Sequence, residues 1–207
     1  MKNLEDLEKK INSELTTKIK ETFIKHDQLY IKINAEDLQD VVLLLKSNKN
    51  TKFQQLIDIT AADFPENKKR FKMVYLLLSH EFNLRIILSY MISENEKILS
   101  LTKIFPSANW MEREIFDMYG VKFTDHPDLR RILTDYGFEG HPLRKDFPLT
   151  GHVEVRYDES QKRVVYDPVK LTQDYRTFDF LSPWEGMTAD LPGDEKASDE
   201  PIEEGQS

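Results

Sequence analysis

The chain changes character near residue 125, and this change limits what it can fold into. Residues 126–187 hold five of the nine prolines, four of the seven glycines and nine of the 22 aromatic residues. No helical period runs through this segment, yet it carries too many large apolar side chains for a solvated linker. We therefore expect a folded domain at 1–125 and, at 126–187, an extended arm that lies on a partner.

Before residue 125, apolar residues recur with the periods of helices and strands. An amphipathic stripe predicts a first helix, and its members are Leu4, Leu7, Ile11, Leu15 and Ile19. A strand at 29–33 precedes a second helix that ends at Ser47, where Asn34 and Asp37 are suited to cap its beginning. The order of elements is thus helix, strand, helix.

Three longer strands follow the second helix. They are expected at 53–61, 70–79 and 83–92, joined by short polar corners. Consecutive strands joined in this way predict a mainly antiparallel sheet, with the helices packed on it in an α+β fold. A further strand is expected at 98–104, before Pro106 interrupts the chain.

A third helix is expected at 110–119. Asn109 and Glu112 have the spacing of a capping pair, and Gly120 stands where a left-handed residue ends a helix. One apolar stripe would face the core, and it consists of Met111, Ile115, Met118 and Tyr119.

The charged side of this third helix is unusual. Phe116 projects among charged residues, which favours a helix covered on a second side; a solvated charged face is the alternative interpretation. Arg113 and Asp117 are four residues apart and can pair on the helix surface.

The remainder of the chain predicts one hairpin and a tail. Strands at 153–157 and 163–166 flank a polar turn inside the arm. Residues 188–207 hold seven acidic residues against Lys196 alone, a composition typical of a disordered acidic tail.

Composition excludes several classes of function. The chain has no cysteine, and thiolates hold most iron–sulfur clusters and structural zinc ions. Its seven glycines form no phosphate-binding motif. Removing the tail's seven acids and one base from the totals of 37 and 29 leaves 30 acids and 28 bases, so nucleic acid is not an expected partner. No apolar run is long enough to span a membrane, and the first residues do not resemble a signal peptide, which predicts a cytoplasmic protein.

Three histidines lie in the arm, at positions 126, 141 and 152. They are 15 and 11 residues apart, whereas metal ligands usually lie two to five residues apart on one element. Structural histidines are therefore expected. A metal-dependent hydrolase that uses His126, His141 and Asp135 is kept as an alternative.

The arm also contains two basic pairs, Arg130–Arg131 and Arg144–Lys145. Two pairs are too few for a nucleic-acid surface. Among aromatic residues they fit polar anchors at a protein interface, where arginine is enriched. Ordinary surface salt bridges are the alternative interpretation.

One continuous pattern covers the third helix and the beginning of the arm. The run EREIFDMYGVKFTDHPDLRRIL at 112–133, followed by DYGFEGHPLRKDFPL at 135–149, resembles the signature of the respiratory complex I 30 kDa subunit family. The acids and arginine of ERE, Asp117, His126 and Arg130 all stand in register with that signature.

This resemblance implies a structural subunit in the peripheral arm of a proton-translocating NADH:quinone oxidoreductase. It implies no catalytic residue and no cofactor in this chain, with FMN, iron–sulfur clusters and quinone held by partner subunits. It also implies docking on the large 49 kDa-type subunit that shapes the quinone pocket, beside other peripheral-arm subunits. The residues expected at this interface are Glu112, Arg113, Glu114, Phe116, Asp117, His126, Arg130, Arg131, His141, Arg144, Lys145 and Asp146.

The resemblance further implies a location. The chain would lie peripherally on the cytoplasmic face of a bacterial inner membrane, or on the matrix face in a mitochondrion, attached only through the complex. The alternative within the same fold is the equivalent subunit of a membrane-bound hydrogenase or a ferredoxin:quinone oxidoreductase.

Overall fold

The computed structural model describes residues 4–173. It divides the chain into two compact units, Met1–Glu154 and Val155–Ser207. Residues 126–154 belong to the first unit, and the division into a domain at 1–125 and an arm at 126–187 remains a prediction. The end of that arm and the predicted acidic tail at 188–207 lie outside the described residues.

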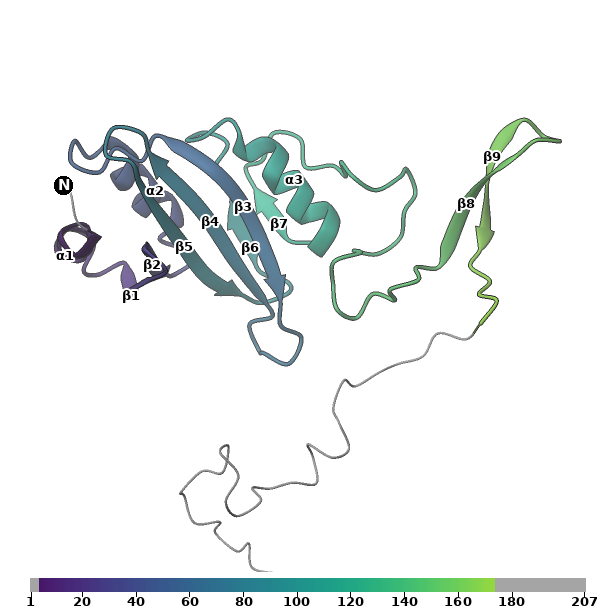
Figure 1. Cartoon of the computed structure of the whole chain (residues 1–207), viewed down its shortest axis with the longest axis horizontal. Coiled ribbons are helices and arrows are strands. Elements are labelled where there is room, and N and C mark those ends of the chain that lie inside the picture. The colour runs from purple at the N-terminus through teal and green to yellow at the C-terminus, as the bar shows by residue number, and fades with distance from the viewer. Residues whose placement is uncertain (1–3, 174–207) are drawn as a thin grey trace, which may run out of the picture. The chain divides into compact units, whose positions relative to one another are not determined.

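A five-stranded sheet forms the centre of the first unit (Figure 1). Its order is β1-β2-β5-β4-β3, with β1 at Ile19–Lys25, β2 at Gln28–Ile33, β3 at Gln55–Asp63, β4 at Phe71–Ser79 and β5 at Leu84–Ile92. All neighbouring pairs are antiparallel except β2 and β5, which run parallel. The prediction of a mainly antiparallel sheet is confirmed.

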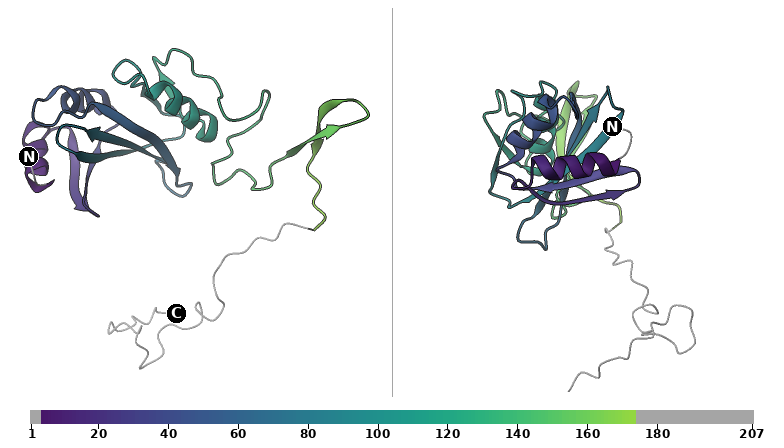
Figure 2. Two further views of the ribbon diagram at one scale, coloured as in Figure 1. Left: turned by 45° about the horizontal axis from the view of Figure 1, so that its top comes forward. Right: turned by 90° about the vertical axis from the view of Figure 1, so that its left-hand side faces the viewer.

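The core lies between one face of this sheet and three helices. Every second residue of β4 is buried, as expected for a strand with one covered face. The helices are α1 (Leu4–Glu14), α2 (Leu38–Ser47) and α3 (Ala108–Tyr119), and each contributes buried apolar side chains to one continuous cluster. The right-hand view of Figure 2 shows α1, in purple, lying along β1 and β2. The α+β fold is confirmed.

The beginning of the chain differs from the prediction. The first helix ends at Glu14, and Ile19 instead begins β1. Pairing of β1 with β2 explains the change, because it satisfies the backbone groups of 19–25 while Thr22 still contacts α1 through Asn12. The second helix begins at Leu38 without a side-chain cap, since Asn34 donates to the Asp37 carboxylate at 3.1 Å.

The region around α3 contains a short second sheet. The strand predicted at 98–104 is only β6 (Lys97–Leu99), and it pairs in parallel with β7 (Lys122–Thr124), which the sequence did not predict. The expected Asn109–Glu112 capping pair is wrong, because α3 begins at Ala108 and Glu112 points into the core. Gly120 ends α3 in the left-handed conformation with φ of 80°, as predicted.

The predicted hairpin is confirmed as β8 (Val153–Asp158) and β9 (Arg163–Pro168). On one side of it, Arg156 forms an ion pair with Asp167 at 2.5 Å. The alternating residues present large apolar side chains that are all more than half exposed, and they include Val155, Tyr157, Val164 and Tyr166.

No helix among residues 4–173 has the length and apolar character that crossing a membrane requires.

The turn between β1 and β2 offers a test of the sheet's edge. His26 and Asp27 both have positive φ, at 50° and 56°, the backbone that a two-residue type I′ turn demands and that Asn-Gly adopts best. Replacing His26→Asn together with Asp27→Gly is expected to raise the free energy of unfolding by about 1 kcal/mol, measured by urea denaturation. The same two residues placed at Lys49 and Asn50, which lack positive φ, should not stabilise the protein, and an equal gain there would contradict this explanation.

Candidate functional site: a strap anchored on helix α3

Residues 126–151 form a segment without helix or strand that lies beside α3 (Figure 1). We call this segment the strap. It contains most of the residues that the sequence predicted at an interface. The contacts that hold it in place come from α3 and from the ends of β3, β4 and β5.

Asp117 is the main anchor of the strap. Its side chain is fully buried, and one carboxylate oxygen accepts the backbone N–H groups of Ile132, Leu133 and Thr134 at 3.0, 2.8 and 2.8 Å. The other oxygen accepts Thr134 Oγ1 at 2.5 Å and Arg131 Nη1 at 2.8 Å. Burial raises the pKa of Asp117, but the hydrogen bonds from Thr134, Arg131 and Leu133 outweigh it and hold that pKa well below its usual range.

The strap also binds the C-terminal end of α3. Three consecutive backbone carbonyls at this end accept hydrogen bonds from the strap. The Asp117 carbonyl accepts His141 Nδ1 at 2.8 Å. The Met118 carbonyl accepts the Leu143 N–H at 3.1 Å, and the Tyr119 carbonyl accepts Arg144 Nε at 2.6 Å. These carbonyls have no partner within the helix, and a cation is favourable at this end of the helix dipole. Burial lowers the pKa of His141, which is consistent with a neutral imidazole that donates through Nδ1.

Gly120 allows this close approach. A Cβ at this position would lie 2.5 Å from Arg144 Nη2 and 2.6 Å from His141 Nε2. The glycine is therefore needed for its conformation and for the space that it leaves to both side chains.

A second anchor joins the strap to the sheet. Arg70 binds Asp63 through two hydrogen bonds of 2.7 and 2.9 Å and reaches Asp146 of the strap at 2.8 Å. The Lys145 N–H donates to the same Asp63 carboxylate at 2.8 Å. The hydrogen bond from Arg70 is the main cause that lowers the pKa of Asp63. Arg144 adds an ion pair with Glu94, which follows β5.

Three other residues expected at the interface, Arg113, Arg130 and Glu114, differ in what they contact. Arg113 donates to the carbonyls of Arg130 and Arg131 at 3.1 and 3.0 Å, so the predicted Arg113–Asp117 pair is wrong: each side chain finds its partners in the strap. The Arg130 side chain forms an exposed ion pair with Asp128, and Glu114 is exposed.

Phe116, Glu112 and His126 are covered. The Phe116 ring meets the His141 ring edge to face at 6.3 Å, which confirms that the strap covers α3 on its second side. Glu112 and His126 have fully buried side chains. Thus the predicted charged residues mostly bond within their own chain.

The exposed surface of the strap carries several large apolar side chains among charged ones. Four of its large side chains are more than half exposed, and Tyr136 is 99% exposed; the other three are Leu133, Leu143 and Leu149. The prediction missed these residues, because it looked for polar anchors. Their only signal in the sequence is the frequency of leucine and tyrosine in a segment without a period.

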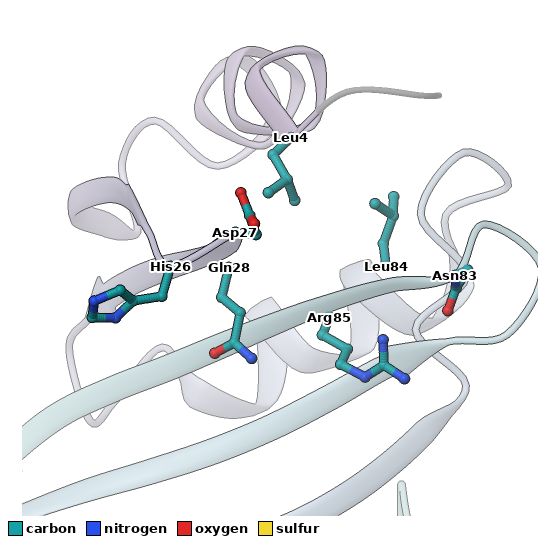
Figure 3. A pocket seen from close by; sticks show the side chains of 7 residues that line it. All are labelled: Leu4, His26, Asp27, Gln28, Asn83, Leu84 and Arg85. Carbon is teal, nitrogen blue, oxygen red and sulfur yellow. The ribbon is translucent and has the colours of Figure 1, made fainter.

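The described part of the chain shows no chemically convergent pocket. A hollow of about 340 Å³ lies between α1 and two turns of the sheet, and Figure 3 shows the side chains of His26 and Arg85 at its rim pointing away from each other. No group of three or more histidine, aspartate or glutamate side chains in residues 4–173 could hold a metal ion. The strap is therefore the candidate binding surface.

Solved structures share this fold. A chain in the structure of an archaeal membrane-bound sulfane sulfur reductase, a respiratory membrane complex, matches with a TM-score of 0.61 at 23% identity, over 70% of this chain and 85% of that one. A trypsin-resistant fragment of Nqo5 matches with a TM-score of 0.50 at 23% identity, over 61% of this chain and 98% of the fragment. At this identity they support the fold alone.

Relatives in sequence are much closer. A subunit of the NADH-quinone oxidoreductase of Chelativorans sp. (strain BNC1) is 54% identical over 194 residues, covering 94% of this chain and 97% of the relative. The corresponding subunit from Ruegeria pomeroyi is 58% identical over 169 residues, covering 82% and 84%. Residues 31–153 match the family described as respiratory-chain NADH dehydrogenase, 30 Kd subunit. Because this match spans more than half of the chain and includes all of α3 and the strap, the chain belongs to the family of the respiratory-chain NADH dehydrogenase 30 kDa subunit.

Proposed function

We propose that this chain is a non-catalytic subunit in the peripheral arm of a proton-translocating NADH:quinone oxidoreductase, docked on the large 49 kDa-type subunit that shapes the quinone pocket. The name shared by its relatives supports membership of that complex. The exposed large apolar side chains of the strap are the observation that carries the docking role.

The strap has the features of a preformed binding surface. Leu133 illustrates them, because its N–H is bound to Asp117 while its side chain is 63% exposed. A segment fixed by buried polar contacts loses little conformational entropy when a partner covers it. Large apolar side chains held outward in this way favour burial in a protein interface.

The hairpin β8–β9 supplies a second apolar surface. Tyr157 is 61% exposed and Tyr166 55% exposed. A two-stranded hairpin is at best marginally stable in water. A partner that covers this apolar face would stabilise the hairpin, which fits an obligate subunit better than an independent protein.

The function of such a subunit is to position its neighbours. Redox centres and a quinone pocket depend on geometry held to within about an ångström. In this proposal FMN, iron–sulfur clusters and quinone belong to partner subunits, and the chain lies peripherally on the cytoplasmic face of the membrane through its contacts with them.

Charged substitutions on the strap test this function. Tyr136→Asp combined with Leu133→Asp is expected to reduce recovery of the assembled complex at least tenfold, because two carboxylates would be buried unpaired in the interface. The measurement is affinity purification of the tagged chain from gently solubilised membranes, followed by assay of bound flavin and iron. The cofactors of the recovered partners also distinguish this complex from a related hydrogenase.

The matched control is Leu43→Asp, since Leu43 is a 48% exposed apolar residue of α2. It should leave recovery unchanged. Equal recovery of the strap variant and the wild-type chain would contradict docking through the strap.

A further inference from the structure

Glu112 is a buried acid that the proposed docking does not use. Its Oε1 accepts the Leu101 N–H at 2.7 Å, whereas Oε2 is buried without a hydrogen-bond partner among the described residues. That free oxygen lies 3.9 Å from Nε2 of His126, and both side chains are completely buried. A carboxyl oxygen that is buried without a hydrogen-bond partner destabilises the folded protein, so its presence calls for an explanation.

His126 connects α3 to the beginning of the strap. Its Nδ1 accepts the Asp128 N–H at 3.1 Å, and its Nε2 lies 3.1 Å from the Asn109 carbonyl. Because a backbone N–H donates to Nδ1, the proton of the neutral ring must be on Nε2, which donates to Asn109. This arrangement joins the first turn of α3 to residues 126–128.

The surroundings of Glu112 offer no strong cation. Tyr75 of β4 and Tyr90 of β5 face it with their hydroxyl groups 2.8 Å apart, and Glu96 is the other acid that acts on Tyr90. The charged neighbours on α3, Arg113 and Asp117, bond to the strap instead. His126 is therefore the group to which an ionised Glu112 is drawn.

Burial raises the pKa of Glu112 to about 7, while Ser100 and the Leu101 N–H act in the opposite direction. The acid thus changes its charge near neutral pH in the folded protein. Asn109 and Pro127, which flank the pair, also line a surface hollow of about 330 Å³, so the buried pair lies near solvent.

We propose that Glu112 is a proton-operated switch for the attachment of the strap to α3. When Glu112 is protonated, His126 keeps its bonds to Asn109 and Asp128 and holds the beginning of the strap. When the proton leaves to water, the carboxylate attracts the Nε2–H of His126 across the 3.9 Å gap, and the bonds that hold residues 126–128 weaken. This switch does not depend on the proposed function.

The direction of the pH effect follows from the pKa of Glu112. The attached state binds the proton more tightly than a detached state, in which water reaches the carboxyl group and its pKa returns toward the ordinary value of 4.5. Attachment is therefore strongest at low pH and weakens as the pH rises from about 4.5 to about 7, above which it is constant.

Hydrogen exchange on the full chain tests the switch. After correction for the intrinsic pH dependence of exchange, protection of the Asp128 amide is expected to fall at least tenfold between pH 5.5 and pH 7.5. Glu112→Gln keeps the shape and the acceptor for Leu101 but cannot ionise, so protection should no longer change. Glu114→Gln, on the exposed side of the same helix, should behave like the wild-type chain.

Carbon NMR of the Glu112 carboxyl group in the wild-type chain gives an independent measurement. Its chemical shift is expected to change with a midpoint near pH 7, over the same pH range in which the Asp128 amide loses protection. The same pH dependence of protection in Glu112→Gln as in the wild-type chain, or constant protection in the wild-type chain, would overturn the proposal.

Discussion

Replacing Asp117→Asn is expected to lower the free energy of unfolding by about 3 kcal/mol, because the carboxylate is buried and accepts five hydrogen bonds. The amide keeps one acceptor oxygen and turns an NH₂ group toward donors, and it leaves Arg131 without its charged partner. Urea denaturation followed by circular dichroism at pH 7 measures the loss, and limited proteolysis should cut the strap of the variant first.

A surface aspartate provides the control for this substitution. Asp128 pairs with Arg130 where both side chains are more than half exposed, so Asp128→Asn should change the free energy of unfolding by no more than about 0.5 kcal/mol. The pKa of Asp117 is lowered by folding, so its contribution is present above the ordinary value of 3.8 and is lost as the pH falls below it. The two proteins should therefore converge in strong acid. Equal losses for both variants at pH 7 would show that Asp117 does not anchor the strap.

Replacing Gly120→Ala is expected to lower the free energy of unfolding by a similar amount, about 3 kcal/mol. About 1 kcal/mol comes from a left-handed alanine, and the remainder from displacement of His141 and Arg144, each of which loses a hydrogen bond to the end of α3. Thermal and urea denaturation of the full chain measure this loss.

The chain contains a matched glycine for comparison. Gly137 has φ of 79°, almost the same as the 80° of Gly120, but a Cβ there would meet no atom within 4 Å. Gly137→Ala should therefore lower the free energy of unfolding only by the cost of a left-handed alanine, about 1 kcal/mol. If both variants lose the same stability, the space beside Gly120 is not needed for the strap.

Much of the fold could be predicted, because periodic burial determines most of its elements. Burial alternates without a break in β4 and with one interruption each in β3 and β5, and each helix carries an apolar stripe. Residues 19–25 were not recognised as a strand because Ile19 continues the stripe of α1, and only pairing with β2 decides between the two. β6 and β7 are three residues each and pair across a separation that no local pattern reveals.

The sequence named residues that form the contacts between α3 and the strap, but not which partner each of them binds. The resemblance located Asp117, His141 and Arg144, yet local spacing suggested Arg113 as the partner of Asp117. The actual partner is Arg131, 14 residues away, together with backbone N–H groups. A sequence does not show which backbone groups an irregular segment leaves unsatisfied, and so it could not show that Asp117 binds the strap while Leu133 and Leu143 are exposed.

The parallel pairing of β2 with β5 has a consequence for synthesis of the chain. Leu29 of β2 pairs with Ile86 of β5, so the hairpin β1–β2 leaves the ribosome 57 residues before its neighbour exists. At typical translation rates of ~5–20 residues per second, this delay is about 3–11 s. During that time the edge of β2 that later pairs with β5 presents unpaired backbone N–H and C=O groups, which leaves the nascent amino-terminal segment open to pairing with other strands.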